Sequence, residues 1–322
     1  MIGIGLYGAN GHQIHHLLEK QPRARLVAVA AFDPKNLPPG LRQDKSIAVC
    51  ASLEELLANP QVQLVSLCSP RRRNQAGEAV RCLHAGKHVY AEKPCAMTEA
   101  DLDAILAAAA MTGRKFHEMA GTGFEQPYLA LGNVVKSGVL GEIIQVFAQK
   151  SYPYHAGRPQ DEDVDGGLIG QNAIHGVRMV EHVAGQRIVA VGAIETGCGN
   201  PVCGGGLRMA ASLHCTLAHG GIATVIANYL NQKGMGCWGN EHLRIFGTCG
   251  FVEAVDGGTR TRLVVGEQDR GPLDISAAGV DFFGCVLDDI QGRAPMPVSL
   301  EDELHPTRVV IQARLAAARK DS

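Results

Sequence analysis

The stretch of residues 86–94, with the sequence GKHVYAEKP, carries the most reactive side-chain pattern in the chain. It predicts a short strand over residues 88–91 that ends directly in an acid, Glu92, and a base, Lys93. Ligands bind outside the carboxyl ends of the strands of a parallel sheet, so Lys93 would project into a crevice from a rigid support. An amine placed in this way can take or give a proton. The alternative is an exposed Glu–Lys pair without a catalytic role.

A second candidate lies in a helix predicted over residues 168–184. Gln171 and His175 are four residues apart and therefore share one face of that helix, with Asn172 and Arg178 beside it. A histidine with an amide one turn away, just after a Gly-Gly pair, is a candidate acid/base. A structural role is the alternative, because a single helical histidine is usually structural.

A tight turn follows the first predicted strand, residues 1–7, and precedes a helix predicted over residues 12–20. A phosphate-binding turn must follow its strand and open a helix, and the residues in that place are Gly8, Ala9, Asn10, Gly11 and His12. Their backbone N–H groups would hold a pyrophosphate at the helix start. An earlier G-x-G-x-x-G match has two of its glycines inside the strand and is therefore not this turn. The turn departs from the usual pattern, since Asn10 replaces the middle glycine and Gln13 replaces the last.

Asp33 directly follows the second predicted strand, residues 25–32, and lies 33 − 11 = 22 residues past Gly11. An acid about 20 residues beyond the turn binds the ribose hydroxyls of a dinucleotide. Because an acid also repels a 2′-phosphate, the sequence predicts NAD, while nearby Lys35 leaves NADP open. An ordinary Asp-Pro turn is the alternative.

Ser69 and Pro70 end a buried strand predicted over residues 63–68, and a helix is predicted over residues 71–85. Three arginines open this helix, and the first of them is Arg71. The arginines could reach the phosphates of the cofactor. The alternative is a solvated charge run on the surface.

The composition indicates a globular protein of two domains rather than a nucleic-acid-binding or membrane protein. The 322 residues are 46% hydrophobic with a formal net charge of −2, so there is no basic excess, and no apolar run reaches transmembrane length. The ten cysteines show no C-x-x-C spacing, which favours a reduced, cytoplasmic protein over a disulfide scaffold or a zinc site. The acidic run at residues 161–165 has the spacing of a solvated loop, so no metal is predicted.

Strands and helices alternate through residues 1–120, which predicts an α/β Rossmann domain with a doubly wound parallel sheet. Residues 121–322 are predicted to form an α+β domain for substrate binding and oligomerisation. Strand follows strand between residues 187 and 265, which implies a largely antiparallel open sheet with helices on one face. The last helices, predicted over residues 274–291 and 299–317, close the chain, and the C-terminal one could pack back on the first domain. The other face of the sheet needs a cover, so we expect a homodimer or homotetramer.

These motifs together resemble the glucose–fructose oxidoreductase, inositol dehydrogenase and rhizopine-catabolism (Gfo/Idh/MocA) family of NAD(P)-dependent oxidoreductases. The likeness covers nearly the whole chain, and its most specific part is the stretch of residues 86–94. Ser69-Pro70 resembles the threonine–proline element of the family, and residues 136–142, 245–250 and 298–314 also fit. The resemblance implies that Lys93 contacts the reacting hydroxyl and the nicotinamide region, while His175 serves as acid/base. We further expect cofactor contacts from the phosphate turn and from Asp33, Ser69, Pro70, Arg71, Asn74 and Glu92.

The chain also departs from the family pattern around the predicted substrate pocket. Gln171 stands where family members usually carry an aspartate, and a neutral amide cannot raise the pKa of an imidazole by its charge. Arg178 replaces a later aspartate, and Asn74 replaces a frequent histidine. An arginine usual after the fifth strand is missing from residues 121–124.

The leading hypothesis is an NAD(H)-dependent oxidoreductase that interconverts a secondary alcohol and its ketone in a sugar, polyol or cyclitol-like substrate. In that reaction Lys93 and His175 act on the hydroxyl proton as acid/base groups, and Gln171 assists them. One alternative uses the same hydride step transiently for elimination or glycoside hydrolysis. Another is a ligand-sensing regulatory protein without catalysis.

Overall fold

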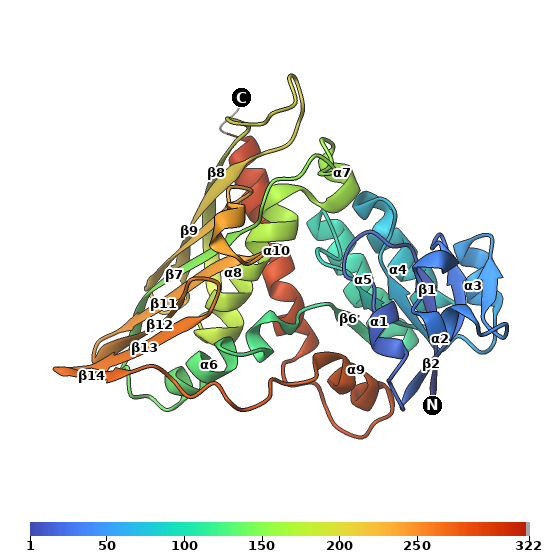
Figure 1. Cartoon of the computed structure of the whole chain (residues 1–322), viewed down its shortest axis with the longest axis horizontal. Helices are drawn as coiled ribbons and strands as arrows, with labels where there is room; N and C mark the ends of the chain where they lie inside the picture. The colour runs from blue at the N-terminus through green and yellow to red at the C-terminus, as the bar shows by residue number, and fades with distance from the viewer. Residues whose placement is uncertain (320–322) are drawn as a thin grey trace. The chain divides into compact units, whose positions relative to one another are not determined.

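A computed structural model describes residues 1–319 of the chain and divides it into two compact units. The first unit comprises Met1–Met119, Asp163–Asp165 and Phe282–His305. The second comprises Ala120–Glu162, Gly166–Asp281 and the described residues 306–319. Each unit is built around a sheet of its own (Figure 1).

The first unit contains a six-stranded parallel sheet in the order β3-β2-β1-β4-β5-β6, which confirms the predicted Rossmann fold. Its strands are β1 (Ile2–Tyr7), β2 (Ala24–Ala30), β3 (Ala48–Cys50), β4 (Leu64–Leu67), β5 (His88–Ala91) and β6 (Phe116–Glu118). The strand order reverses between β1 and β4, and ligands bind at such a switch point. The phosphate turn follows β1 and Ser69-Pro70 follows β4, so both predicted cofactor segments lie at this point.

The helices of the first unit are α1 (His15–Leu18), α2 (Pro39–Arg42), α3 (Leu53–Ala58), α4 (Gln75–His84), α5 (Glu99–Thr112) and α9 (Phe282–Ile290). Two of them, α3 and α5, begin at residues whose side chains cap them. Ser52 accepts a hydrogen bond from the Glu55 N–H at the start of α3, and Thr98 accepts one from the Asp101 N–H at the start of α5. Gly113 ends α5 with a left-handed φ of 64°.

Two predicted helices of this unit are shorter than expected. The helix predicted over residues 12–20 is reduced to α1, because the phosphate turn extends through Gln13, whose side chain holds it. The helix predicted over residues 71–85 starts with a 3₁₀ turn, η2 (Arg72–Asn74), and becomes α-helical only at Gln75. The short edge strand β3 was not predicted.

The second unit contains an eight-stranded sheet in the order β14-β13-β12-β11-β7-β10-β9-β8. All neighbouring pairs are antiparallel except β10 and β7, which confirms a largely antiparallel sheet. The strands are β7 (Ile143–Ser151), β8 (Ile188–Thr196), β9 (Ala210–Leu217), β10 (Ile222–Asn228), β11 (Asn240–Gly247), β12 (Gly250–Val255), β13 (Arg260–Val265) and β14 (Gln268–Gly271). The edge strand β14 was not predicted.

Helices cover one face of this second sheet and bury its apolar side chains (Figure 1). They are α6 (Tyr128–Lys136), the segment formed by η4 (Ile169–Ala173), α8 (Ile174–Arg178) and η5 (Met179–Val183), and part of α10 (Leu300–Ala318). Both η4 and η5 are π-helical, so the helix predicted over residues 168–184 is wider at both ends than an α-helix. The helix predicted over residues 274–291 is wrong in its first half, since α9 begins at Phe282.

Within residues 1–319, none of the helices combines the length and the apolarity needed to cross a membrane. The same residues contain no group of three or more His, Cys, Asp or Glu side chains arranged to hold a metal ion.

Candidate active site

The phosphate turn is a closely packed backbone loop in the first unit. Gly8 has φ +73°, and its N–H donates to the carbonyl of Ala30 at 3.0 Å. A Cβ at Gly8 would lie 2.0 Å from the carbonyl oxygen of Cys68, so the turn admits only glycine at this position. The Asn10 N–H donates to the same Cys68 oxygen at 3.2 Å. The turn is therefore fixed to the carboxyl ends of β2 and β4, while Ala9 is exposed.

Gln13 explains how the turn tolerates the loss of its last glycine. Its buried amide donates to the Gly8 carbonyl at 2.9 Å and accepts from the Ser66 hydroxyl at 2.5 Å. The side chain of residue 13 therefore fastens the turn to β4. A glycine at this position would instead permit close packing of the backbone.

Asp33 lies three residues beyond β2 and is exposed. One carboxylate oxygen accepts a hydrogen bond from the Lys35 N–H at 2.9 Å and caps a short 3₁₀ turn, η1 (Pro34–Asn36). This cap fixes the carboxylate after the strand next to β1, where a ribose-binding acid belongs. A glycine turn with exposed residues and an acid at this distance fits a dinucleotide.

Glu92 and Lys93 are buried at the end of β5, with exposed fractions of 1% and 3%. The Lys93 ammonium lies 4.0 Å from a Glu92 carboxylate oxygen, and the Lys93–Pro94 peptide is cis. Burial alone would raise the pKa of Glu92, but the hydrogen bond and charge of His12, with Lys93 and Arg72, lower it to about 2. A permanent anion therefore stands beside Lys93.

The same Glu92 carboxylate contacts the phosphate turn. It accepts a hydrogen bond from the His12 N–H at 2.5 Å, and the His12 ring lies 3.0 Å away. A Cβ on Gly11, which has φ +120°, would come within 2.6 Å of this carboxyl group. The structure thus brings together His12, Gly11 and Glu92, three of the predicted cofactor residues.

The remaining predicted cofactor residues follow β4. The Ser69 hydroxyl donates to the buried carboxylate of Glu78, and Pro70 accepts a long hydrogen bond from the Asn10 amide. Arg71 lies 3.8 Å from the carboxylate of Asp163. Asn74 is exposed at the start of α4.

Sequence reasoning missed two side chains in this unit, Arg72 and Gln75. Both are buried, and Gln75 makes hydrogen bonds on both sides of Lys93, to the carbonyls of Glu92 and Pro94. Arg72 was considered only as part of an arginine run. The apolar spacing of α4 gives no signal for either contact.

His175 lies in the second unit and is 8% exposed. Its Nδ1 is 2.9 Å from the Thr122 hydroxyl and its Nε2 is 3.2 Å from the Tyr152 hydroxyl. Two neutral hydroxyls therefore orient the imidazole. Neither was predicted, although Thr122 lies within the residues where the usual family arginine is missing.

Gln171 donates to the hydroxyl of Tyr229 at 2.5 Å. The guanidinium of Arg158 lies over the same Tyr229 ring at 3.7 Å, a cation–π contact. Asn172 donates to the Asn228 carbonyl, and Arg178 is fully buried. Gln171 and Asn172 are thus held by a tyrosine hydroxyl and a backbone carbonyl.

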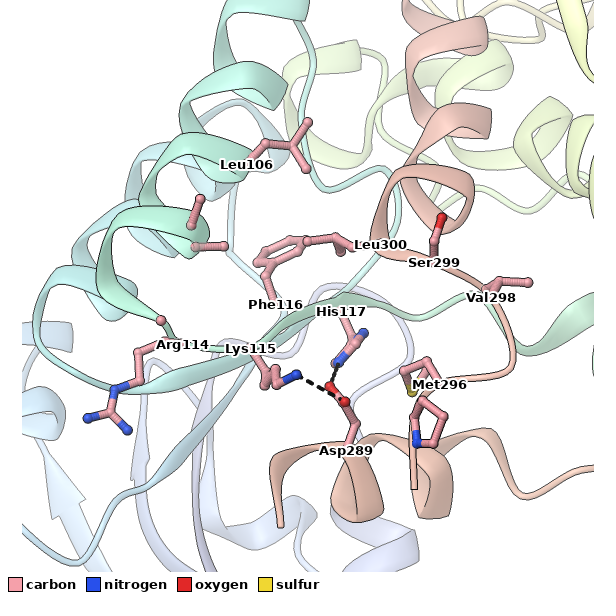
Figure 2. A pocket seen from close by; sticks show the side chains of 14 residues that line it. Leu106, Arg114, Lys115, Phe116, His117, Asp289, Met296, Val298, Ser299 and Leu300 are labelled. Atoms are coloured by element: carbon pink, nitrogen blue, oxygen red, sulfur yellow. Dashed lines mark hydrogen bonds and ion pairs between the residues drawn. The ribbon is translucent and has the colours of Figure 1, made fainter. Parts of the chain in front are cut away.

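A cavity of about 610 Å³ also lies in the first unit, but it contains none of the predicted site residues (Figure 2). It is lined by the end of α5, by residues 114–117 and by residues 295–300. His117 reaches the cavity wall and is held between the carboxylates of Asp289, at 3.1 Å, and Glu303, at 2.9 Å. Residues 113–115 precede β6, so the cavity is at the amino ends of the strands, opposite the phosphate turn.

The Rossmann sheet, the glycine turn with its acid and the buried lysine after β5 define an NAD-binding oxidoreductase. Residues 1–119 match the oxidoreductase family with an NAD-binding Rossmann fold, and residues 128–253 match the GFO/IDH/MocA C-terminal domain. These matches cover more than half of the chain. The protein therefore belongs to the GFO/IDH/MocA oxidoreductase family.

Curated relatives of the chain include dehydrogenases. It is 26% identical to 4-carboxy-2-hydroxymuconate-6-semialdehyde dehydrogenase of Sphingobium, over 80% of this chain and 78% of that protein. It is 29% identical to 1-carboxy-3-chloro-3,4-dihydroxycyclohexa-1,5-diene dehydrogenase of Comamonas testosteroni, over 52% of this chain and only 43% of that protein. An inositol 2-dehydrogenase of Gluconacetobacter diazotrophicus is 28% identical over 46% of this chain and 45% of that protein.

Solved structures share the fold over the whole chain. An oxidoreductase domain protein from Kribbella flavida has a TM-score of 0.82 at 20% identity, covering 99% of this chain and 97% of that one. The aldose–aldose oxidoreductase from Caulobacter crescentus has a TM-score of 0.77 at 22% identity, covering 99% and 98%.

Proposed function

We propose that the protein is an NAD-dependent oxidoreductase that interconverts a secondary alcohol and its ketone in a sugar, polyol or cyclitol-like substrate. The observation that carries this proposal is Lys93, a buried lysine that follows β5 and lies in a loop bonded to the phosphate turn. Relatives that are named for an inositol and for a dihydroxylated ring support the substrate class.

Oxidation of a secondary alcohol requires removal of the hydroxyl proton and transfer of a hydride. The bound NAD supplies the hydride acceptor. Lys93 polarises the hydroxyl oxygen as a cation or takes its proton as a neutral amine, and the Glu92 carboxylate 4.0 Å away favours the cationic form. We therefore assign the electrostatic role to Lys93 and the proton transfer to His175.

His175 is suited to proton transfer because both ring nitrogens meet hydroxyl groups. A hydroxyl can donate to one ring nitrogen and accept from the other, so Thr122 and Tyr152 can hold either tautomer of the ring. Gln171, which is bonded to Tyr229, would shape the pocket wall rather than charge the imidazole.

The decisive experiment combines a substrate panel with the substitution Lys93→Met. Polyols, sugars and hydroxy acids are incubated with NAD or NADP, and the absorbance of the reduced cofactor is followed. Substrate consumption without a change in that absorbance would instead support the elimination or hydrolysis chemistry. We expect Lys93→Met to abolish turnover and to leave NADH binding, measured by its fluorescence, within about threefold of the wild type.

Lys87→Met is the matched control. The Lys87 ammonium donates to the carbonyls of Asn59 and Val62 at the amino end of the same strand, so its loss should lower stability and spare turnover. Wild-type turnover by Lys93→Met would overturn the proposal.

A further inference from the structure

Gln75 is a fully buried amide at the first position of α4, and all of its hydrogen-bonding capacity is used. Its Nε2 donates to the Glu92 carbonyl at 2.5 Å and to the Pro94 carbonyl at 3.2 Å. Its Oε1 accepts from the Ser69 N–H at 3.2 Å and from the Arg72 guanidinium at 2.5 Å. Two donated and two accepted bonds are the full complement of an amide side chain.

The chemistry of these partners fixes the orientation of the amide. A backbone N–H and a guanidinium can only donate, so they must face the oxygen, and two carbonyls can only accept, so they must face the nitrogen. A glutamate at position 75 would fit the space but would direct a carboxylate oxygen at two carbonyl oxygens. The position therefore requires a group that both donates and accepts.

The two carbonyls that Gln75 holds belong to the residues on either side of Lys93. Arg72, which is 2% exposed, continues the connection, because its second terminal nitrogen donates to the Asn10 carbonyl at 2.7 Å. A chain of hydrogen bonds thus runs from the peptides around Lys93, through Gln75 and Arg72, to the phosphate turn.

A second connection joins the same two segments. The Glu92 carboxylate accepts from the His12 N–H, two residues beyond Asn10. The Lys93 loop is consequently fastened to the phosphate turn at two points, residues 10 and 12. A displacement of the phosphate turn would therefore shift the peptides on either side of Lys93 through these hydrogen bonds.

We propose that Gln75 is a positioning residue that, through Arg72, couples the placement of Lys93 to the occupancy of the phosphate turn by the dinucleotide. This inference rests on the catalytic role proposed above for Lys93. The mutual arrangement of turn and lysine is then set before the substrate binds, which lowers the cost of orientation in the reaction.

The test uses two backbone amides as reporters of the loop. The Glu92 N–H donates to the Leu67 carbonyl, and the Cys95 N–H donates to the Glu118 carboxylate, so hydrogen exchange at both measures how firmly the loop is held. Exchange is measured in the full-length protein with and without NADH, relative to the amides of β1. In Gln75→Glu we expect both reporters to exchange about tenfold faster and to lose their protection by NADH.

Kinetics provide the second measurement, on any substrate found in the panel. Because Lys93 is displaced while the pocket is intact, we expect kcat to fall about 10- to 100-fold and KM to change less than about threefold. If Gln75→Glu does not fold, Gln75→Met, which removes every polar contact without adding charge, is measured in its place.

Leu83→Ala is the matched control for a loss of stability alone. Leu83 is fully buried at the other end of α4, so this substitution weakens the same helix without touching the Lys93 loop. The proposal is overturned if the Gln75 variants match Leu83→Ala in reporter exchange. Retention of activity by Lys93→Met would overturn the catalytic assignment instead, and the exchange measurement is independent of that result.

Discussion

Gly11 shows at the scale of single residues how tightly the phosphate turn is packed against the Lys93 loop. Its φ of +120° is unfavourable for any side chain, and a Cβ would lie 2.6 Å from the Glu92 carboxyl group. Gly11→Ala therefore adds backbone strain and pushes away the anion that binds His12. We expect a loss of about 2–4 kcal/mol in the free energy of unfolding and NADH binding weaker by at least about tenfold.

Gly86→Ala is a control that separates the effect of backbone strain from the effect of the contact with Glu92. Gly86 also has positive φ, +76°, but apart from its own chain neighbours no residue comes within 4 Å of the position of a Cβ. This control should therefore cost about 1 kcal/mol by strain alone and leave NADH binding unchanged. Thermal melting and NADH fluorescence titration measure both variants. Equal NADH affinities for Gly11→Ala and the wild type would show that the contact with Glu92 has no role in cofactor binding.

Residue types and spacing allowed part of this site to be predicted. Lys93, Glu92 and the glycine turn are marked by their positions after strands, and strand ends are visible in an apolar pattern. Gln75 and Arg72 could not be predicted, because their role depends on three loops that meet only in the folded chain. Burial of Arg72 even contradicts the usual expectation that a run of arginines is solvated.

At the scale of elements, His117 joins β6 to the C-terminal segment that packs on the Rossmann sheet. It pairs with Asp289 of α9, which Lys115 also binds (Figure 2). It pairs as well with Glu303 of α10. Burial alone would lower the pKa of His117, but the hydrogen bonds that its ring donates to the two carboxylates outweigh burial and raise the pKa to about 9. Burial raises the pKa of Glu303, which also accepts from the Glu118 N–H.

The stability of the first unit should therefore fall at alkaline pH. A group whose pKa is higher in the folded than in the unfolded state stabilises the folded state fully at pH values below its unfolded-state pKa. For His117 the unfolded-state pKa is 6.5, and the stabilisation is lost as pH rises through the folded-state pKa of about 9. The loss is on the order of 3 kcal/mol, since each pKa unit corresponds to about 1.4 kcal/mol. Thermal melting between pH 6 and pH 10 measures it.

His117→Gln is the control for this pH dependence. A glutamine keeps hydrogen-bonding capacity without titrating, so the variant should be less stable than the wild type at neutral pH and the difference should shrink above pH 9. If the two melting curves remain parallel across this range, the imidazole does not carry the charge that links the elements.

A sequence pattern predicts that a helix or strand exists better than it predicts where that helix or strand begins and ends. Apolar spacing identified the helix that carries His175, but not the π-turns at both of its ends, of which η4 contacts β7 and β10 while η5 contacts β7 and α6. The predicted helix that begins at residue 274 is wrong over residues 274–281, which are exposed and lie outside any helix or strand.

At the scale of the whole molecule, the two-sheet organisation was predictable because the spacing of strands changes sharply near residue 120. Alternation with helices forces parallel pairing, whereas consecutive strands allow antiparallel pairing. The parallel pair β7–β10 could not be predicted. A helical segment and the strands β8 and β9 lie between β7 and β10 in the chain, and β10 pairs with β7 only because the chain returns to the centre of the sheet after them.

The second sheet keeps a partly exposed apolar face opposite its helices. Phe246 is 36% exposed and packs against Phe251 of the next strand in a tilted arrangement, at 5.8 Å between ring centroids. In the same row of the sheet lie Gln145 and Val264, and Ile222, which is 51% exposed. Contiguous exposed apolar patches can mark sites of protein–protein contact. A second copy of the chain is the simplest cover, because a sheet face can pack on itself about a twofold axis.

We therefore expect the wild type to run as a dimer or tetramer in size-exclusion chromatography with light scattering. Phe246→Asp places a charge in this row and should shift the mass to that of one chain, while NADH binding, which depends on the first unit, stays intact. Met111→Asp is the matched control, because Met111 is 72% exposed on α5 and the same charge there should leave the mass unchanged.

A wild type that elutes as a single chain at micromolar concentration would contradict the prediction, and so would a Phe246→Asp variant that keeps the assembled mass. Melting of each variant distinguishes dissociation from unfolding, since a folded monomer still shows a cooperative transition.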